Sequence, residues 1–419
     1  MPRLSPLSSL TLPWTTMKLA TRFFVPLVLW FTVGQLLRYG IFYGAYRFIG
    51  NGVVPIIALS LGVLTQLAVT VAMLHSVRDG LDAIRHGEMD DQLAPWAARD
   101  EESIFDAMGR ALFPFLIFYI AWGWFANDAR DLTGFAEGRD FAESGGSIFA
   151  QEGHAILDGL SHHMYAAGIA TAVFFAVKAA TEWWLVPRLA RVGPLLLSAF
   201  ELNWTLFGIF TVDYYRGNAA DWLTDRAVWA DIGALFGWAG ALWPSFKFAV
   251  LGALVWLVIA GVVLGVDSDE TAAVGRGRLG RRLAAVSGIH KQRSPREVLS
   301  RELREKWFPA VHGFRMVRRA GWLPFGVFCV LFTGLDMGRE YLRRGIYYLL
   351  GPHDVPWWMV RLPAVNFTVD LIHDVLRICL LAAAFNLLVA RVSARNAARR
   401  APYVPAGQTA GYADPAPLR

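Results

Sequence analysis

The sequence has only two cysteines, Cys329 and Cys379, and both lie inside apolar segments. It contains no CxxC pair and no Cys/His ligand spacing, which argues against a disulfide framework and against a structural zinc site. It also has no GxSxG, no HExxH and no GxGxxG after a strand-like segment. Short apolar strands alternating with amphipathic helices are missing as well. These absences argue against a soluble α/β enzyme.

Long apolar runs are abundant. The chain is 55% hydrophobic and only 18% charged, with a mean hydropathy of +0.39. Because a helix of about 20 apolar residues crosses the hydrocarbon core of a bilayer, we predict an all-α, polytopic integral membrane protein with about eight transmembrane helices in four helical hairpins. The predicted spans are 23–44, 52–77, 110–127, 163–187, 193–213, 243–266, 320–342 and 364–391.

One region leaves the number of spans open. Residues 227–266 are apolar for about 40 positions, nearly twice the length that one span requires. Pro244 interrupts this run, so we expect an in-plane or re-entrant helix near 220–240 followed by a single span. A ninth span is the alternative, and it would place the C-terminus on the opposite side.

The basic residues predict the topology. With eight spans, 28 Lys and Arg fall on one side and 10 on the other, so the positive-inside rule places both termini in the cytoplasm. Arg outnumbers Lys 35 to 5, a bias typical of a GC-rich bacterial genome, and we expect the bacterial cytoplasmic membrane. Residues 1–22 form a cytoplasmic tail in this interpretation, 23–266 a six-helix membrane part, 320–391 a C-terminal hairpin, and 392–419 a disordered tail.

Two predicted cytoplasmic loops carry opposite charge. Residues 78–110 have a net charge of −5, whereas residues 267–320 have a net charge of +7. Within the basic loop, 267–319, the pattern at 295–308 predicts an amphipathic helix that binds anionic lipid; an ordinary basic loop is the alternative. Either charged loop could recruit a protein partner, and no nucleic-acid partner is expected.

Polar residues share one face of each of the last two predicted spans. Asp370, His373, Asp374 and Arg377 fall at roughly 0°, −60°, +40° and −20° around a helix. Such a face avoids lipid because one charged residue at mid-bilayer costs about 2.5 to 3.5 kcal/mol. The preceding helix presents a second polar face, formed by Thr333, Asp336, Glu340, Arg343 and Arg344. The two faces predict a proton or cation path; the alternative is a structural seam in which Arg377 pairs with Asp374 and Arg343 with Glu340.

Two further candidates lie elsewhere. Glu201 stands in the middle of the fifth predicted span, where a carboxylate buried alone would take up a proton, as in proton-coupled carriers; it could instead pair with Arg377 or another helix. His154, Asp158 and His162 recur every four residues and could hold a divalent metal or a haem, or form a metal-free surface cluster.

Three functional hypotheses follow. The first is a permease-like protein that moves a small solute or ion through a polar intramembrane seam. The second is a non-catalytic membrane subunit or scaffold that uses its charged cytoplasmic loops. The third is a metal- or haem-dependent membrane enzyme. The absence of catalytic motifs favours a protein that is not an enzyme, and no cofactor is expected apart from the divalent metal just described.

Overall fold

The computed structural model describes residues 6–46, 54–81, 164–181, 242–264 and 321–400, together with isolated positions within 111–132 and 200–208. Every regular element in these residues is a helix, and no strand occurs among them. The all-α prediction is therefore confirmed for this part of the chain.

Four described helices are long and apolar enough to cross a membrane: Phe24–Ala45, Ile57–Gly80, Leu242–Val263 and Val360–Val392. They coincide with the first, second, sixth and eighth predicted spans and indicate a membrane-embedded protein. Residues of the predicted fourth span form a shorter helix, α9 (Met164–Ala180). The third and fifth spans fall mostly outside the described residues, so the eight spans and four hairpins stay predictions.

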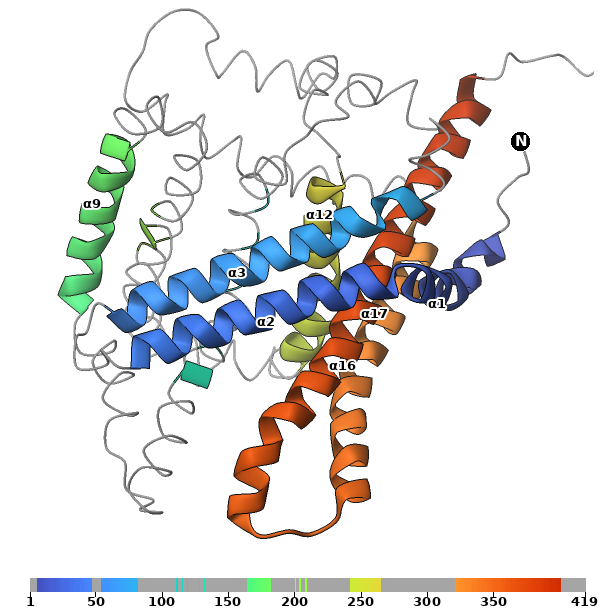
Figure 1. The fold of residues 1–419 in the computed structure, drawn as a ribbon. Helices are drawn as coiled ribbons and strands as arrows, with labels where there is room; N and C mark the ends of the chain where they lie inside the picture. Colours follow the sequence, from blue (N-terminus) through green and yellow to red (C-terminus); the bar gives the residue numbers. More distant parts are fainter. Residues whose placement is uncertain are drawn as a thin grey trace, which may run out of the picture.

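Helices α2 (Phe24–Tyr46) and α3 (Val54–Val77) lie side by side (Figure 1). Both are apolar around most of their surface, apart from polar residues such as Gln35 and Arg38 of α2, as expected for helices that face lipid or other helices. Gly34 of α2 faces Val69 of α3 so closely that an added Cβ would overlap the valine side chain. A small residue at such a point lets two membrane helices approach each other closely.

Helices α16 (Trp322–Leu350) and α17 (Val355–Arg400) form a second adjacent pair. Gly351 ends α16 with a positive φ of 78°, and its N–H donates to the carbonyl of Tyr347, an arrangement that favours glycine. α17 has 46 residues, or roughly 69 Å of helix. It continues to Arg400, past the predicted end of the last span at 391.

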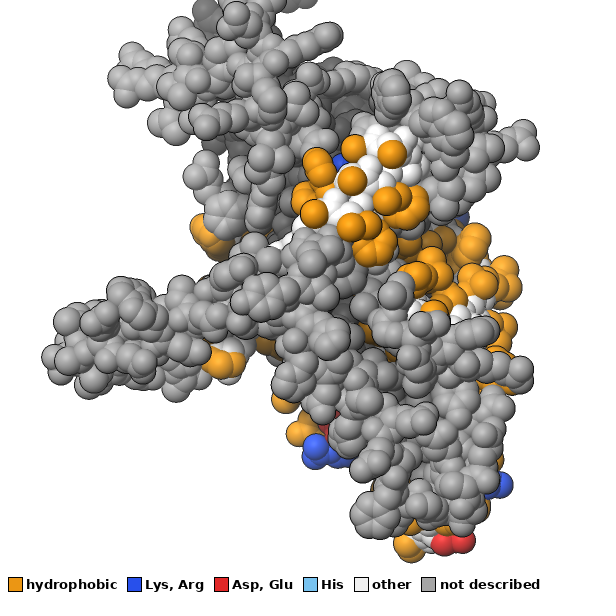
Figure 2. Space-filling model, turned by 90° about the vertical axis from the view of Figure 1, so that its left-hand side faces the viewer, with side chains coloured by type: hydrophobic (Ala, Val, Ile, Leu, Met, Phe, Trp, Pro, Cys, Tyr) orange, Lys and Arg blue, Asp and Glu red, His pale blue; other side chains and the backbone are white. Residues whose placement is uncertain are grey.

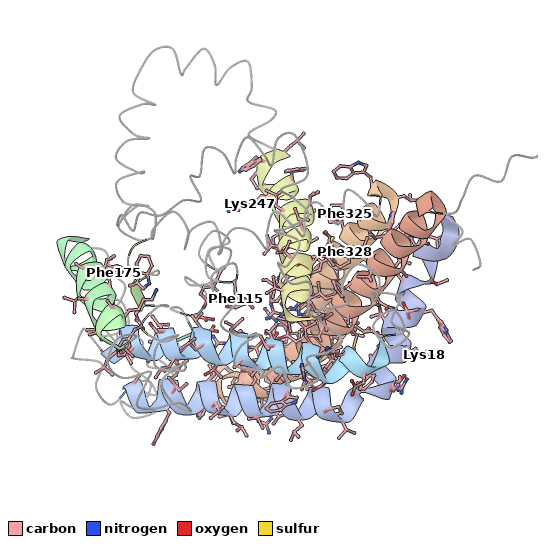
Figure 3. All side chains as sticks on the ribbon, turned by 90° about the horizontal axis from the view of Figure 1, so that it is seen from above. Lys18, Phe115, Phe175, Lys247, Phe325 and Phe328 are labelled. Carbon is pink, nitrogen blue, oxygen red and sulfur yellow. The ribbon has the colours of Figure 1, made fainter. Side chains whose placement is uncertain are left out.

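α16 corresponds to the seventh predicted span, yet it is not among the four helices whose composition suits a membrane. Five charged residues lie from Asp336 to Arg344, and two of them, Asp336 and Arg339, contact α17. The first turns of α16 are apolar: Phe325 and Phe328 are buried and lie beside α12 (Figure 3).

Helix α12 (Ala253–Val263) lies at the centre of the described helices and contacts α3, α16 and α17. It is buried on almost every side, as its uniformly apolar sequence requires. A π-helical segment, Lys247–Gly252, leads into it. The α2–α3 pair crosses the α16–α17 pair instead of running parallel to it (Figure 1).

The exposed side chains fit an apolar surrounding. Figure 2 shows one face of the molecule, on which the described side chains are mostly hydrophobic. Large apolar residues are exposed on α2 and α9, among them Val25, Leu36 and Val173. Lipid contact accounts for such exposure without a protein partner.

The predicted N-terminal tail, 1–22, contains a helix. α1 (Leu12–Arg22) begins after a 3-10 turn, Pro6–Thr11, and packs against α17. Pro13 lies in its first turn, where the missing N–H costs nothing. α1 therefore belongs to the packed structure.

Candidate functional site

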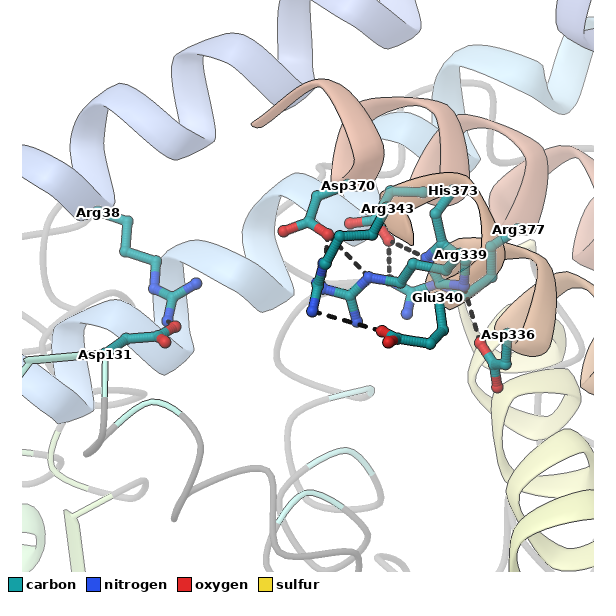
Figure 4. A network of polar contacts seen from close by, with 10 residues as sticks. Arg38, Asp131, Asp336, Arg339, Glu340, Arg343, Asp370, His373 and Arg377 are labelled. Carbon is teal, nitrogen blue, oxygen red and sulfur yellow. Dashed lines mark hydrogen bonds and ion pairs between the residues drawn. The ribbon is translucent and has the colours of Figure 1, made fainter. Parts of the chain in front are cut away.

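Charged side chains of α16 and α17 meet between the two helices (Figure 4). We call this group the polar seam. Its residues recur every three or four positions on both helices, so each helix directs one face at the other. The members are Asp336, Arg339, Glu340, Arg343 and Arg344 of α16 and Asp370, His373, Asp374 and Arg377 of α17.

His373 is the most buried member of the polar seam, with only 4% of its surface exposed. Its Nε2 lies 2.7 Å from Oδ1 of Asp336 on the facing helix, and its Nδ1 lies 3.0 Å from Oδ1 of Asp374. Two such hydrogen bonds require two protons among the three groups. Either the imidazole is charged between two carboxylates, or it is neutral and one carboxyl group is protonated.

Arg377 continues this chain of contacts toward α12. Its Nη2 lies 3.0 Å from Oδ1 of Asp374, and its guanidinium carbon lies 4.4 Å from the centre of the Trp256 ring. A cation over a tryptophan ring is stabilised without a second carboxylate. Arg377 therefore links α17 to α12, while its buried Nε has no hydrogen-bond partner.

A second part of the polar seam is more exposed. Arg339 contacts Oδ1 of Asp370 through Nε at 2.8 Å and Nη2 at 2.5 Å. Glu340 forms ion pairs with two arginines of its own helix, Arg343 at 3.6 Å and Arg344 at 3.0 Å. The whole polar seam holds four carboxylates and four guanidinium groups. His373 is the member whose side-chain type ordinarily titrates near neutral pH.

The structure brings six sequence-predicted candidates together: Asp336, Glu340, Asp370, His373, Asp374 and Arg377. The predicted pairs Arg377–Asp374 and Arg343–Glu340 are both present. Sequence reasoning missed Arg339 and Trp256. Arg339 falls roughly 60° from Asp336 on the same helical face, so the spacing contained this signal, whereas nothing in the sequence pointed to Trp256.

A second polar cluster, which the sequence did not predict, lies at α2. Arg38 is within 2.7 Å of both Asp128 and Asp131, and the hydroxyl of Tyr119 donates to Asp128. The guanidinium group of Arg38 also lies over Phe42, with its carbon 5.2 Å from the ring centre. The sequence feature that could have indicated this cluster is Arg38 itself, an arginine inside an apolar run. Its partners lie about ninety residues away in the chain.

The remaining predicted candidates fall outside the described residues. Glu201 is one of them, although the neighbouring Asn203 is described and accepts a buried hydrogen bond from Ser60 of α3 at 2.6 Å. His154, Asp158 and His162 are also outside. Within the described part, no group of three or more His, Cys, Asp or Glu side chains is arranged to hold a metal ion.

The polar seam can hold a proton and pass it between two helices. His373 can accept a proton on one ring nitrogen and release one from the other, and a carboxylate lies at each end. Comparisons of the chain with protein-family models, with curated proteins and with solved structures find no match. The interpretation of the site therefore rests on the chemistry of its residues.

Proposed function

We propose that the chain is a permease-like membrane protein that moves a small solute or ion and uses the polar seam as its proton-carrying part. One observation carries this proposal: a buried imidazole lies between carboxylates of two helices, and one of these helices is a candidate membrane span. Ionisable groups inside a membrane-spanning helix are costly and typically serve ion or proton pathways.

The proposed mechanism couples protonation to the contact between α16 and α17. When His373 is charged, it is attracted to Asp336 on α16 and to Asp374 on α17. When it loses a proton, only one ring nitrogen can donate, so one of the two ionised carboxylates loses its partner. Because Asp374 keeps Arg377 as a second partner, the remaining N–H serves Asp336, whose only partner among the described residues is His373. The link from α17 to Asp336 then changes from an attraction between opposite charges to a hydrogen bond from a neutral ring, so the contact between α16 and α17 weakens there.

Glu201 is the second carrier in this proposal. Its position in the middle of the fifth predicted span suits a carboxylate that binds a proton or a solute.

A structural role is the second candidate function, and the pairing of charges favours it. Each of the four carboxylates in the polar seam contacts a basic side chain. A self-neutralising seam could simply hold α16 and α17 together, as in a membrane scaffold whose charged loops recruit a partner.

Proton flux into liposomes separates the two functions. The purified protein is reconstituted with a trapped pH-sensitive dye, and Asp336→Asn and Asp374→Asn are compared with Arg361→Gln. Arg361 is exposed on α17 beside Trp357 and lies outside the polar seam, so its loss should change the flux less than about twofold. We expect the two Asp variants to stay folded and to lose at least about tenfold in flux, because a required proton acceptor is gone.

Two results would contradict transport through the polar seam. Folded Asp variants with wild-type flux would remove the carriers from the mechanism. Variants that no longer elute as a single folded species would instead support the structural role, because a broken buried pair typically costs about 3 to 5 kcal/mol.

A further inference from the structure

Helix α1 has two different faces. Leu12, Thr16, Leu19 and Ala20 are buried, and α1 packs with α17. The opposite face carries Trp14, Met17, Lys18 and Thr21, which lie within roughly 100° around the helix and are all exposed. Trp14 is 76% exposed and Met17 52% exposed, and Lys18 lies at the edge of the molecule (Figure 3).

The position of α1 relative to the membrane follows from its connections. Phe23 alone separates α1 from the candidate span Phe24–Ala45. Phe23 and Leu19 also lie against Gly80, the last residue of the candidate span Ile57–Gly80. Because two spans end beside it, α1 lies at the boundary between hydrocarbon and water.

The charge on this segment has one sign. Residues 1–22 contain Arg3, Lys18 and Arg22 and no Asp or Glu. Arg22 is exposed at the end of α1, with its guanidinium carbon 5.3 Å from the centre of the Phe23 ring. An exposed helix face that combines Trp and Met with basic residues and lies at a membrane boundary matches an anionic lipid surface.

We propose that the exposed face of α1 binds the anionic phospholipids of the membrane surface, with Trp14 and Met17 among the acyl chains and Lys18 and Arg22 at the phosphates. The opposite face stays packed on α17. The lipid-contacting helix thus touches the helix that carries half of the polar seam. The lipid site does not depend on the proposed transport, because it is argued from α1 and the two candidate spans beside it, and not from the polar seam.

A spin label on α1 tests this placement in the full-length protein. Met17→Cys is labelled and reconstituted into nanodiscs of phosphatidylcholine alone or mixed with phosphatidylglycerol; the native Cys329 and Cys379 are buried. Collisions of the label with oxygen, which enriches in lipid, are compared with collisions with a water-soluble nickel chelate. The lipids that stay bound to the unlabelled protein are counted by native mass spectrometry for wild type, Lys18→Gln/Arg22→Gln and the neutral control Thr21→Gln.

We expect the label to collide mainly with oxygen in nanodiscs that contain phosphatidylglycerol. Retained phosphatidylglycerol should fall by at least about fivefold in the double variant, since one basic residue near an anionic surface is worth roughly that factor. Thr21→Gln should retain the wild-type amount. Because Lys18 and Arg22 are both exposed, the double variant should fold, and its elution profile checks this.

Three results would overturn the proposal. A label that collides mainly with the nickel chelate would place the face in water. If the wild type and the double variant retained the same amounts of phosphatidylglycerol and of phosphatidylcholine, Lys18 and Arg22 would give no preference for anionic headgroups. Efficient cross-linking of Met17→Cys between two chains would make the face a contact between copies.

Discussion

Arg339 and Asp370 form the ion pair that joins α16 to α17 most directly. Both guanidinium contacts converge on one carboxylate oxygen, at 2.8 and 2.5 Å. The Glu340–Arg344 pair, at 3.0 Å, lies within α16 and is more exposed. The two pairs share the same chemistry but differ in burial and in whether they connect two helices.

A double-mutant cycle should separate the two pairs. For Arg339→Gln and Asp370→Asn, we expect a coupling free energy of about 1 to 2 kcal/mol, because the pair is partly buried and joins two helices. For Arg344→Gln and Glu340→Gln, we expect about 0.3 to 0.5 kcal/mol, as for an exposed pair on one helix. Unfolding free energies of the purified variants in detergent give both values. Equal couplings would mean that the contact between Arg339 and Asp370 adds no more than an exposed pair within one helix.

The residues of the polar seam show what a sequence can predict. Helical spacing placed Asp370, His373, Asp374 and Arg377 on one face, because that depends only on the period of the helix. It did not pair His373 with Asp336, because this contact depends on the register between α16 and α17. The register is determined by the turn after Gly351 and by side-chain packing, which helical spacing does not encode.

At the scale of elements, the contact between Gly34 and Val69 controls how closely α2 and α3 pack. The atom that an added Cβ would meet is Cγ2 of Val69. A valine cannot turn this methyl group away easily, because its rotamers are restricted. Gly40 lies on the same helix and has open space around it, which makes it a matched control.

Gly34→Ala should destabilise the protein by about 1 to 3 kcal/mol, since the added methyl group overpacks the interface. Gly40→Ala should be neutral or slightly stabilising, because alanine favours helix and meets no atom there. Thermal unfolding in detergent compares the two. The double variant Gly34→Ala/Val69→Ala should recover part of the loss, and a Gly34→Ala variant as stable as Gly40→Ala would refute close packing at this point.

Helix α1 shows why some elements escape sequence reasoning. Its 11 residues are too few to cross a bilayer, and its surroundings are rich in Pro, Ser and Thr. Its buried face depends on α17, which lies more than 300 residues away in the chain. Apolar length is a local property of the sequence, and it predicted α2, α3 and the apolar part of α17. The partner of a short amphipathic helix is not a local property, so the sequence did not predict it.

At the scale of the whole molecule, α12 connects the helix pairs. It is buried between α3, α16 and α17, and Trp256 brings it to Arg377 of the polar seam. The α2–α3 pair crosses the α16–α17 pair (Figure 1). Hydropathy alone could not predict this crossing, because it records the length of a span but not its direction relative to other spans. In this arrangement the buried His373 lies close to the point where three helices meet.

The proton flux of His373→Gln is the most direct test of the proposed function. Glutamine can still hydrogen-bond but cannot change its charge. In liposomes with a trapped pH-sensitive dye, wild-type flux should vary between about pH 5 and 8, where histidine ordinarily titrates. The charged groups around His373 include Asp336, Asp374, Arg339 and Arg377. The account predicts that folded His373→Gln has at least about tenfold lower flux with no such pH dependence. Folded His373→Gln with the flux and pH profile of the wild type would contradict it.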